Sequence, residues 1–341
     1  MRLLIVKLSA LGDVVQTLPS LTLIKNNFPD FQIDWVVDER NAEIIEGHPY
    51  IDRLLIFSKK YLVSIKRLRK FVKELRKYEY EAVIDYQGLF KSGIIVRFSK
   101  AKYKIGFSNY REGSPLFYNF ILPPYDFNLH AVKRYIFLTT EVLKILNINK
   151  SFEVPEEIPH SVFSKNILEN NLNFIKKPYI VFIPSARWMT KWWPLSYWER
   201  LVEDCEELGK DFDIFITGSL SEVELKNWAE KIERKYFYVY SLVGKLSLKE
   251  LANLIKNSQV VVSVDTGPMH IASALRKPTV ALFGPTSPER TGPWGGIAKI
   301  IRSSSFCSPC FNKKCKDVNC MKEIKPEEVK KALYELLDYS L

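Results

Sequence analysis

A chain of 341 residues with 47% hydrophobic residues is long enough for two domains with packed cores, which excludes a largely disordered protein. No apolar run approaches the roughly 20 residues of a membrane span and no signal peptide opens the chain, so we expect a soluble, cytoplasmic protein. The net charge of +11 is local, because residues 59–111 hold 15 Lys and Arg against 4 Asp and Glu. This confined positive region indicates an anionic partner such as nucleic acid, an acidic membrane or a phosphorylated substrate; the alternative is a solvated helix face.

Apolar runs of strand length alternate with amphipathic stretches along the chain. The predicted strands are 3–6, 33–37, 82–86, 179–183, 213–217, 260–264 and 279–284, and the predicted helices include 59–77, 196–209, 221–234 and a segment starting at Pro326. Continuous apolar strands separated by helices are typical of parallel sheets covered on both faces. We therefore predict an α/β fold with two doubly wound domains, 1–155 and 156–325, and a final helix within 326–341 that packs back toward the first domain.

The first candidate site is a carboxylate close to the start of the chain. The stretch LLIV is followed by the small-residue turn SALGD and then by a helical pattern, so Asp13 lies at the mouth of a helix. A carboxylate there is stabilised by the helix dipole and stays anionic. Two interpretations are open at this point: Asp13 caps the helix, or it does chemistry.

A second candidate site follows the predicted strand 260–264. The sequence DTGPMH, residues 265–270, places backbone N–H groups, a hydroxyl and a helix N-terminus together, which suits a diphosphate. The four residues that could contact such a ligand are Asp265, Thr266, Gly267 and His270. The alternative is a capped helix with a buried histidine. The chain contains neither the G-x-G-x-x-G fingerprint nor a P-loop.

Two further strand ends in the second domain carry polar residues. Arg187 and Lys191 follow 179–183 and can neutralise phosphate oxygens. Glu222 follows 213–217 and can accept hydrogen bonds from ribose hydroxyls, although an acid in the first turn of a helix is equally consistent with it. Because three strand ends each supply ligands, we predict a pocket for a nucleoside diphosphate in this domain.

The basic stretch begins with a predicted amphipathic helix. Its expected apolar stripe is Leu62, Ile65, Leu68, Val72 and Leu75, and its other faces carry Lys66, Arg67, Arg69, Lys70, Lys73 and Arg76. Acidic lipid fits this surface at least as well as RNA, for which no ribonucleoprotein-type motif is present.

Four of the five cysteines lie close together, at Cys307, Cys310, Cys315 and Cys320, and Cys205 stands apart. In a cytosolic chain such spacing favours a structural metal site over disulfides, and free or redox-labile thiols are the equal alternative. A catalytic metal is not expected, because no histidine or carboxylate cluster accompanies the thiols.

Motifs in order along nearly the whole chain resemble glycosyltransferase family 9, the lipopolysaccharide heptosyltransferases. They are KLSALGDVVQTLP, DWVVDE, VIDYQGLFKSG, REGSPLFYN, TKWWP, VSVDTGPMHIASAL and LFGPT. The motifs of the first domain are most like heptosyltransferase I, whereas the cysteine cluster is more like other members of the family.

The resemblance implies a GT-B fold, with two Rossmann-like domains facing a central cleft, the acceptor in the N-terminal domain and the sugar nucleotide in the C-terminal one. It implies inverting transfer of L-glycero-D-manno-heptose from ADP-heptose to Kdo of Kdo-lipid A, without a cofactor or a catalytic metal. The family's general base maps onto Asp13. Its donor contacts map onto Lys191, Glu222, Asp265, Thr266, Gly267 and His270, with Arg187 as a charge clamp, and its acceptor contacts onto Lys59, Lys60 and Arg111.

This acceptor lies in a membrane leaflet, so the basic stretch predicts peripheral attachment to the anionic cytoplasmic face of the inner membrane. The alternatives are heptosyltransferase II or another family 9 transferase with a different core-sugar acceptor, and a nucleotide-binding member without catalysis, against which the intact Asp13 argues. From another class, a nucleic-acid-binding protein that uses residues 59–111 is the remaining hypothesis, although no nucleic acid is expected.

Overall fold

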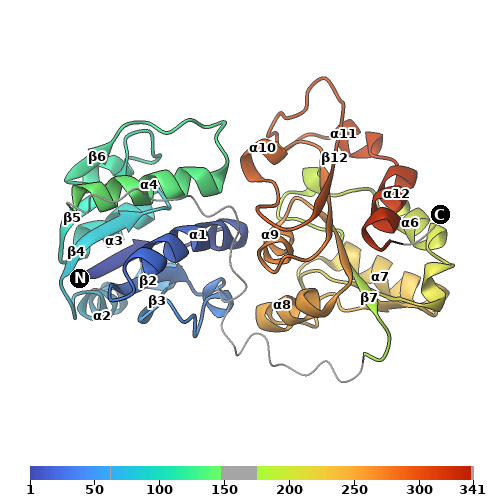
Figure 1. Ribbon diagram of the computed structural model, residues 1–341, viewed down its shortest axis with the longest axis horizontal. Coiled ribbons are helices and arrows are strands. Elements are labelled where there is room, and N and C mark those ends of the chain that lie inside the picture. Colours follow the sequence, from blue (N-terminus) through green and yellow to red (C-terminus); the bar gives the residue numbers. More distant parts are fainter. Residues whose placement is uncertain (62, 147–174, 339–341) are drawn as a thin grey trace. The chain divides into compact units, whose positions relative to one another are not determined.

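The computed structural model describes residues 1–61, 63–146 and 175–338, and the chain divides into two compact units, Met1–Lys165 and Asn166–Leu341 (Figure 1). The predicted boundary at 155/156 lies outside the described residues. No helix in the described ranges combines the length and the apolar character that crossing a bilayer requires.

The first unit is built on a six-stranded parallel sheet with the order β3-β2-β1-β4-β5-β6. Its strands are β1 (Arg2–Val6), β2 (Gln32–Asp38), β3 (Arg53–Phe57), β4 (Tyr80–Asp85), β5 (Ala101–Phe107) and β6 (Phe120–Leu122). Its helices are α1 (Leu11–Asn27), α2 (Ile65–Leu75), α3 (Phe90–Phe98) and α4 (Ala131–Ile145), with short 3-10 turns η1 (Ala42–Ile44), η2 (Lys59–Tyr61) and η3 (Ser114–Phe117).

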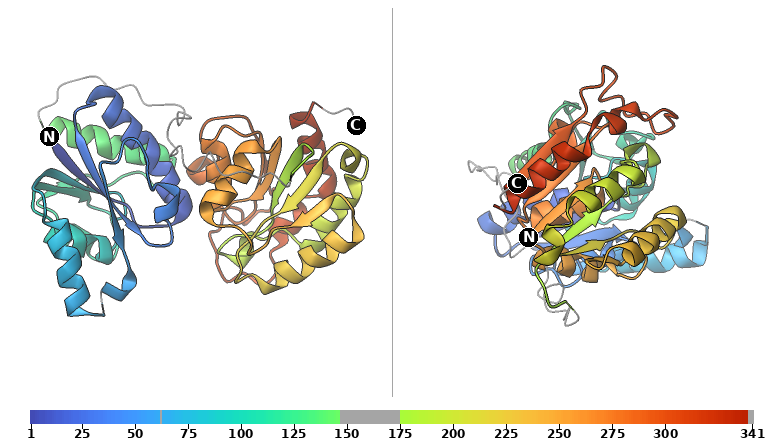
Figure 2. Two further views of the ribbon diagram at one scale, coloured as in Figure 1. Left: turned by 90° about the horizontal axis from the view of Figure 1, so that it is seen from below. Right: turned by 90° about the vertical axis from the view of Figure 1, so that its right-hand side faces the viewer.

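Helices cover both faces of this sheet, which is why its strands are apolar on both sides. On one face, Leu4 and Val83 pack with Phe71 of α2 and Ile95 of α3. Helices α1 and α4 lie side by side over the other face, as Figures 1 and 2 show. The first residues after β1 and β4 therefore emerge at one edge of the sheet, between the two helical layers.

The second unit repeats this plan with the strand order β12-β11-β10-β7-β8-β9, again all parallel. Its strands are β7 (Tyr179–Ile183), β8 (Asp213–Ile216), β9 (Val239–Ser241), β10 (Val260–Val264), β11 (Thr279–Phe283) and β12 (Ala298–Arg302). Its helices are α6 (Leu195–Asp204), α7 (Val223–Lys235), α8 (Leu248–Asn257), α9 (Gly267–Ala274), α10 (Pro288–Thr291), α11 (Asn319–Glu323) and α12 (Pro326–Leu336), with 3-10 turns η5 (Met189–Lys191) and η6 (Leu208–Lys210).

Both sheets have the strand order of the Rossmann fold, and in both the order reverses beside the unit's first strand. The reversal lies between β1 and β4 in one unit and between β7 and β10 in the other. Ligands of such sheets bind beyond the carboxyl ends of the strands at this point. The predicted α/β class with two doubly wound parallel sheets is confirmed, and all seven predicted strands belong to these sheets.

Strands β3, β5, β6, β9 and β12 were not predicted. Four of the five are edge strands and β5 lies next to one, and all five have partly exposed residues. Strands β5 and β12 also carry lysines that interrupt the apolar pattern. Half-buried edge strands lack the continuous apolar run that marks a central parallel strand.

The basic helix α2 differs from its predicted form. It begins at Ile65, after the separate turn η2, and Ser64 caps its first turn by accepting a hydrogen bond from Arg67 N. Its buried residues are Phe71 and Leu75, whereas Ile65 of the expected stripe is exposed. The side chain of Leu62 lies outside the described residues. Of the expected stripe, Leu75 is buried and Leu68 and Val72 are half-buried, so the predicted apolar side is correct within α2 and fails at Ile65, where the helix begins.

The last helix, α12, packs into the core of the second unit. Val329 and Leu333 are fully buried in the core of the second unit, where α12 packs against α6 and strands β10 to β12. The hydroxyl of Tyr334 donates to Asp204 O at 3.3 Å. The apolar face of Pro326–Leu336 is thus buried within the second unit.

Candidate active site

Asp13 lies on the first turn of α1, directly after the carboxyl end of β1. Its Oδ2 accepts a hydrogen bond from Ala10 N at 2.8 Å, which is a helix-capping contact. Its Oδ1 accepts from the hydroxyl of Tyr135 at 3.0 Å. The side chain remains 42% exposed. One carboxylate oxygen therefore caps the helix, as one interpretation predicted, and the carboxylate still remains accessible to solvent.

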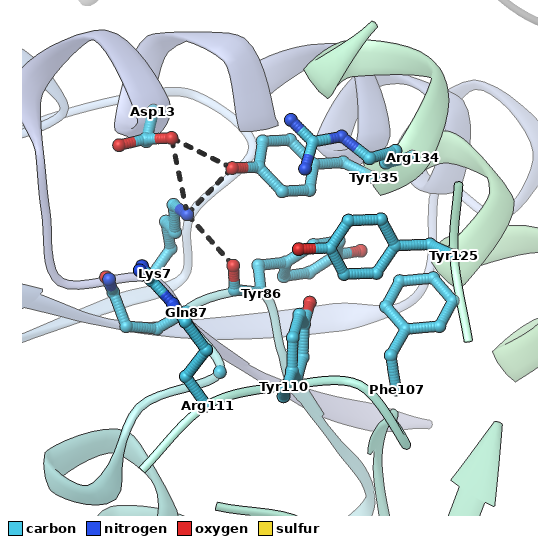
Figure 3. Close-up of a pocket in the computed structure, with 11 residues that line it drawn as sticks. Lys7, Asp13, Tyr86, Gln87, Phe107, Tyr110, Arg111, Tyr125, Arg134 and Tyr135 are labelled. Atoms are coloured by element: carbon cyan, nitrogen blue, oxygen red, sulfur yellow. Dashed lines mark hydrogen bonds and ion pairs between the residues drawn. The ribbon is translucent and has the colours of Figure 1, made fainter. Parts of the chain in front are cut away.

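Lys7, the first residue after β1, lies buried beneath Asp13. Its Nζ donates to the hydroxyl of Tyr135 at 2.8 Å and to Tyr86 O at 2.9 Å, and lies 3.8 Å from Asp13 Oδ1 (Figure 3). Burial lowers the pKa of Lys7, while the charges of Asp13 and Asp85 oppose that shift. Because Tyr135 accepts from Lys7, its proton is directed to Asp13, so the chain Lys7, Tyr135, Asp13 fixes the orientation of the carboxylate.

The turn after β4 holds the turn after β1 in place. Gln87 Oε1 accepts hydrogen bonds from Leu8 N at 3.0 Å and Ser9 N at 2.9 Å. Asp85, which is fully buried, orders this second turn by accepting from Gln87 N, Gly88 N, Ser92 Oγ and the hydroxyl of Tyr118. The loops at the strand-order reversal thus form one hydrogen-bonded unit that carries Asp13.

A cavity of about 140 Å³ opens beside Asp13 at this reversal point. It is lined by Lys7, Asp13, Tyr86, Gln87, Gly88, Phe107, Tyr110, Arg111, Tyr125, Arg134 and Tyr135 (Figure 3). Three cationic side chains, one carboxylate and five aromatic residues therefore line a small space. Such a site favours a ligand that carries both a sugar-like ring and a negative charge.

The second unit holds a larger cavity, of about 420 Å³, at the corresponding position. It is lined by residues that follow β7, β8, β9 and β10, namely Ser185, Ala186, Arg187, Thr217, Gly218, Ser219, Leu220, Glu222, Leu242, Gly244, Leu246, Ser247, Leu248, Leu251, Thr266 and Pro268, together with Ile183 at the end of β7. Glu222 accepts hydrogen bonds from Ser185 Oγ and Ser219 N, both at 2.7 Å. Three predicted donor residues, Arg187, Glu222 and Thr266, line this cavity.

The other predicted donor residues gather at the start of α9. Lys191 Nζ lies 2.6 Å from Asp265 Oδ2, and both side chains are largely buried. Thr266 is the N-cap residue of α9, Gly267 is its first residue, and His270 is buried one turn further along. This arrangement places an ion pair and free helical N–H groups together, as an anion site requires.

The predicted acceptor residues separate in the structure. Arg111 lines the first-unit cavity. Lys60 is an exposed residue of η2 and does not line that cavity, and the side chain of Lys59 lies outside the described residues.

The sequence patterns did not indicate five of the residues that line the first-unit cavity, namely Lys7, Gln87, Tyr110, Arg134 and Tyr135. Only Lys7 carried a local signal, as a charged residue that directly follows a buried strand.

The five cysteines are all free thiols, and Cys205 and Cys320 are buried. Within the part of the chain that the structure describes, no group of three or more His, Cys, Asp or Glu side chains is arranged to hold a metal ion.

The family model for glycosyltransferase family 9 (heptosyltransferase) matches residues 68–320. The chain belongs to this family. It is 32% identical over 331 residues to lipopolysaccharide heptosyltransferase 1 of Pseudomonas aeruginosa, covering 92% of this chain and 87% of the relative. It is 31% identical over 351 residues to the protein of the same name from Campylobacter coli, covering 98% and 99%.

Solved structures of the family share the fold. Escherichia coli heptosyltransferase WaaC with ADP matches with a TM-score of 0.80 and 28% identity, over 98% of this chain and all of that one. Heptosyltransferase II of the same organism matches with a TM-score of 0.77 and 21% identity, over 99% and 98%. The fold of this family 9 member is therefore GT-B, and the protein is a glycosyltransferase.

Proposed function

We propose that this protein transfers L-glycero-D-manno-heptose from ADP-heptose to Kdo of Kdo-lipid A, with inversion at the anomeric carbon and with Asp13 as the general base. The observation that carries this proposal is Asp13 itself: a carboxylate oriented by Lys7 and Tyr135, still open to solvent, at the mouth of a polar cavity. The names of the family relatives support heptose as the transferred sugar.

The donor side of the proposal rests on the second-unit cavity. Glu222 at its wall offers a carboxylate to ribose hydroxyls, and Arg187 and Thr266 line the same space. The diphosphate fits beside them at the start of α9, where Lys191 and helical N–H groups can stabilise the negative charge that develops on the leaving ADP. The solved complex of a relative with ADP-2-deoxy-2-fluoro heptose supports this class of donor.

The reaction follows from the placement of the base. The acceptor hydroxyl oxygen attacks the anomeric carbon of heptose as the bond from that carbon to the diphosphate oxygen breaks, and ADP leaves. The hydroxyl proton passes to Asp13, because the hydroxyl becomes far more acidic as the glycosidic bond forms. Tyr135 and Lys7 hold the carboxylate in one orientation before transfer.

The acceptor and the membrane form the remaining part of the proposal. Arg111 at the first-unit cavity and the basic helix α2 belong to the same unit, which suits an anionic acceptor embedded in an anionic leaflet. We propose that the protein is cytoplasmic and binds the inner membrane peripherally.

The test is release of ADP from ADP-heptose in the presence of Kdo-lipid A, for wild type and for Asp13→Ala. We expect release that depends on acceptor and that falls by about 10²- to 10⁴-fold in the variant, the usual effect of losing a general base. Full activity in a folded variant would leave Asp13 as a helix cap. If only an already heptosylated acceptor supported release by wild type, the protein would be of the type II specificity.

A further inference from the structure

The first-unit cavity contains hydrogen-bond donors that no described residue satisfies. The guanidinium of Arg134, on α4, makes no hydrogen bond or ion pair with a described residue, and its Nε is buried without a partner. The hydroxyl of Tyr110 is likewise buried and unpartnered. Buried polar groups in native proteins are nearly always paired, so two such donors at one cavity indicate a ligand with acceptor atoms.

Both donors are held in place by packing. The ring of Tyr110 lies against Gly88, where a Cβ atom would approach the ring to 2.3 Å and where φ is +64°. Arg134 lies over the ring of Tyr125, with its guanidinium carbon 4.9 Å from the ring centroid. Figure 3 shows the hydroxyl of Tyr110 pointing into the cavity from below and Arg134 reaching toward it from α4. The site is therefore preorganised for its ligand.

The charges at this cavity also lack balance. Lys7 donates its hydrogen bonds to Tyr135 and Tyr86. The other two cationic side chains of the lining, Arg111 and Arg134, have no anionic partner among the described residues. Asp13 is the one carboxylate in the lining, and it repels an anionic ligand. An acceptor that carries a negative charge next to its reacting hydroxyl needs cations to be held there.

We propose that Arg134 and Tyr110 bind the carboxylate of the acceptor sugar, with Arg111 as a second cation at the mouth of the cavity. This inference rests on the proposed function, because the acceptor sugar there is Kdo, a sugar acid. The planar guanidinium pairs with a carboxylate or a phosphate in bidentate fashion, and a tyrosine hydroxyl adds one donor. A cavity of about 140 Å³ suits a charge on the ring that reacts, whereas the lipid A phosphates belong to more distant sugars.

The experiment combines Arg134→Met and Tyr110→Phe with three acceptors: Kdo-lipid A, its Kdo methyl ester, and a form without the lipid A phosphates. Lys133→Met, an exposed neighbour on α4, is the matched control. Charge-assisted hydrogen bonds predict a 10- to 100-fold fall in kcat/KM for Arg134→Met with the natural acceptor, about tenfold for Tyr110→Phe, and no change for Lys133→Met. With the methyl ester as acceptor, the kcat/KM of wild type should fall to the value that Arg134→Met shows with Kdo-lipid A. The kcat/KM of Arg134→Met should be nearly the same with the ester as with the acid.

Three outcomes overturn the inference. Wild type could use the acid and the ester with equal kcat/KM, Arg134→Met could lose kcat/KM equally with both, or the loss of kcat/KM could follow removal of the lipid A phosphates instead.

Binding of free Kdo, measured by saturation-transfer NMR with inorganic phosphate as competitor, separates this inference from the proposed function. Binding by wild type and by Asp13→Ala, but not by Arg134→Met, supports the carboxylate site even if no transfer is seen. Absence of Kdo binding by wild type contradicts it. Arg134→Lys keeps the positive charge. It should therefore bind Kdo more strongly than Arg134→Met does, although more weakly than wild type.

Discussion

Asp13 caps the start of its helix and still presents an oriented carboxylate, so the capping contact is compatible with the proposed role as general base. One carboxylate oxygen satisfies a backbone N–H at the start of α1, and the other is oriented by the Tyr135 hydroxyl. Capping fixes the side chain, and a fixed base is what general-base catalysis requires. The partner on the second oxygen lies 122 residues away in the chain, so no local pattern could have shown it.

His48 gives a residue-scale prediction on pH dependence. It is buried, its Nδ1 accepts from Tyr50 N at 3.0 Å, and its Nε2 has no partner among the described residues. Burial lowers the pKa of His48 to about 3. Since the unfolded chain protonates this histidine near pH 6.5, unfolding binds a proton between pH 6.5 and about 3, and stability falls as the pH drops through that window.

We expect His48→Asn, whose amide oxygen can accept from Tyr50 N, to reduce this loss by about 1.4 kcal/mol per pH unit below pH 6. Urea unfolding at several pH values between 7.5 and 4.5 measures it. Parallel stability curves for variant and wild type would show that His48 does not titrate in this way.

At the scale of elements, α2 is the α-helix of the first unit whose surface is least covered by the rest of that unit: only two of its residues are buried. Its buried side is narrow, with Phe71 and Leu75 in the core, and its remaining surface is basic. Val63 and Ile65, just before and at its start, are 86% and 72% exposed. Exposed apolar side chains beside a basic helix suit the interface of an anionic bilayer.

This predicts that neutral replacement of Lys66, Arg67, Lys70 and Lys73 weakens binding to vesicles that contain phosphatidylglycerol. At about 1 kcal/mol for each basic residue near the surface, we expect a loss of roughly 10- to 1,000-fold, and a similar loss for wild type in high salt. Vesicle sedimentation measures both. The matched control replaces Lys210, Lys231, Arg234 and Lys331, which are exposed residues of the second unit. Equal binding by the two quadruple variants would remove α2 from the membrane contact.

At the scale of the whole molecule, the two units have the same strand order but different loops at the reversal point. In the first unit the loops form a small cavity with aromatic walls and an excess of cationic side chains, and in the second they form a larger cavity beside a helix N-terminus. The common framework places ligands at the same edge of each sheet, and the side chains of the loops decide which ligand binds.

If the second unit alone binds the donor, substitutions in that unit should weaken ADP binding and substitutions in the first unit should leave it unchanged. We expect Glu222→Ala to weaken ADP binding by roughly 10- to 100-fold, because a charged hydrogen-bonding group is lost from the cavity wall. Asp13→Asn should leave ADP affinity unchanged, although it removes the base. Isothermal titration calorimetry with ADP measures both, and a tenfold weaker affinity for Asp13→Asn would contradict this division.

The sequence by itself determined the α/β class, the central strands and the residues at their carboxyl ends, because a parallel strand buried on both faces is a continuous apolar run and its last residue marks the ligand edge. Asp13, Arg187, Glu222 and Thr266 were predicted on that basis, and the structure places them at the two cavities. The tertiary structure alone decided that α12 packs into the core of the second unit and that a separate turn, η2, precedes α2. It alone brought Lys7, Tyr110 and Arg134 together, because contacts between residues more than 20 positions apart depend on strand order and register, which no local spacing records.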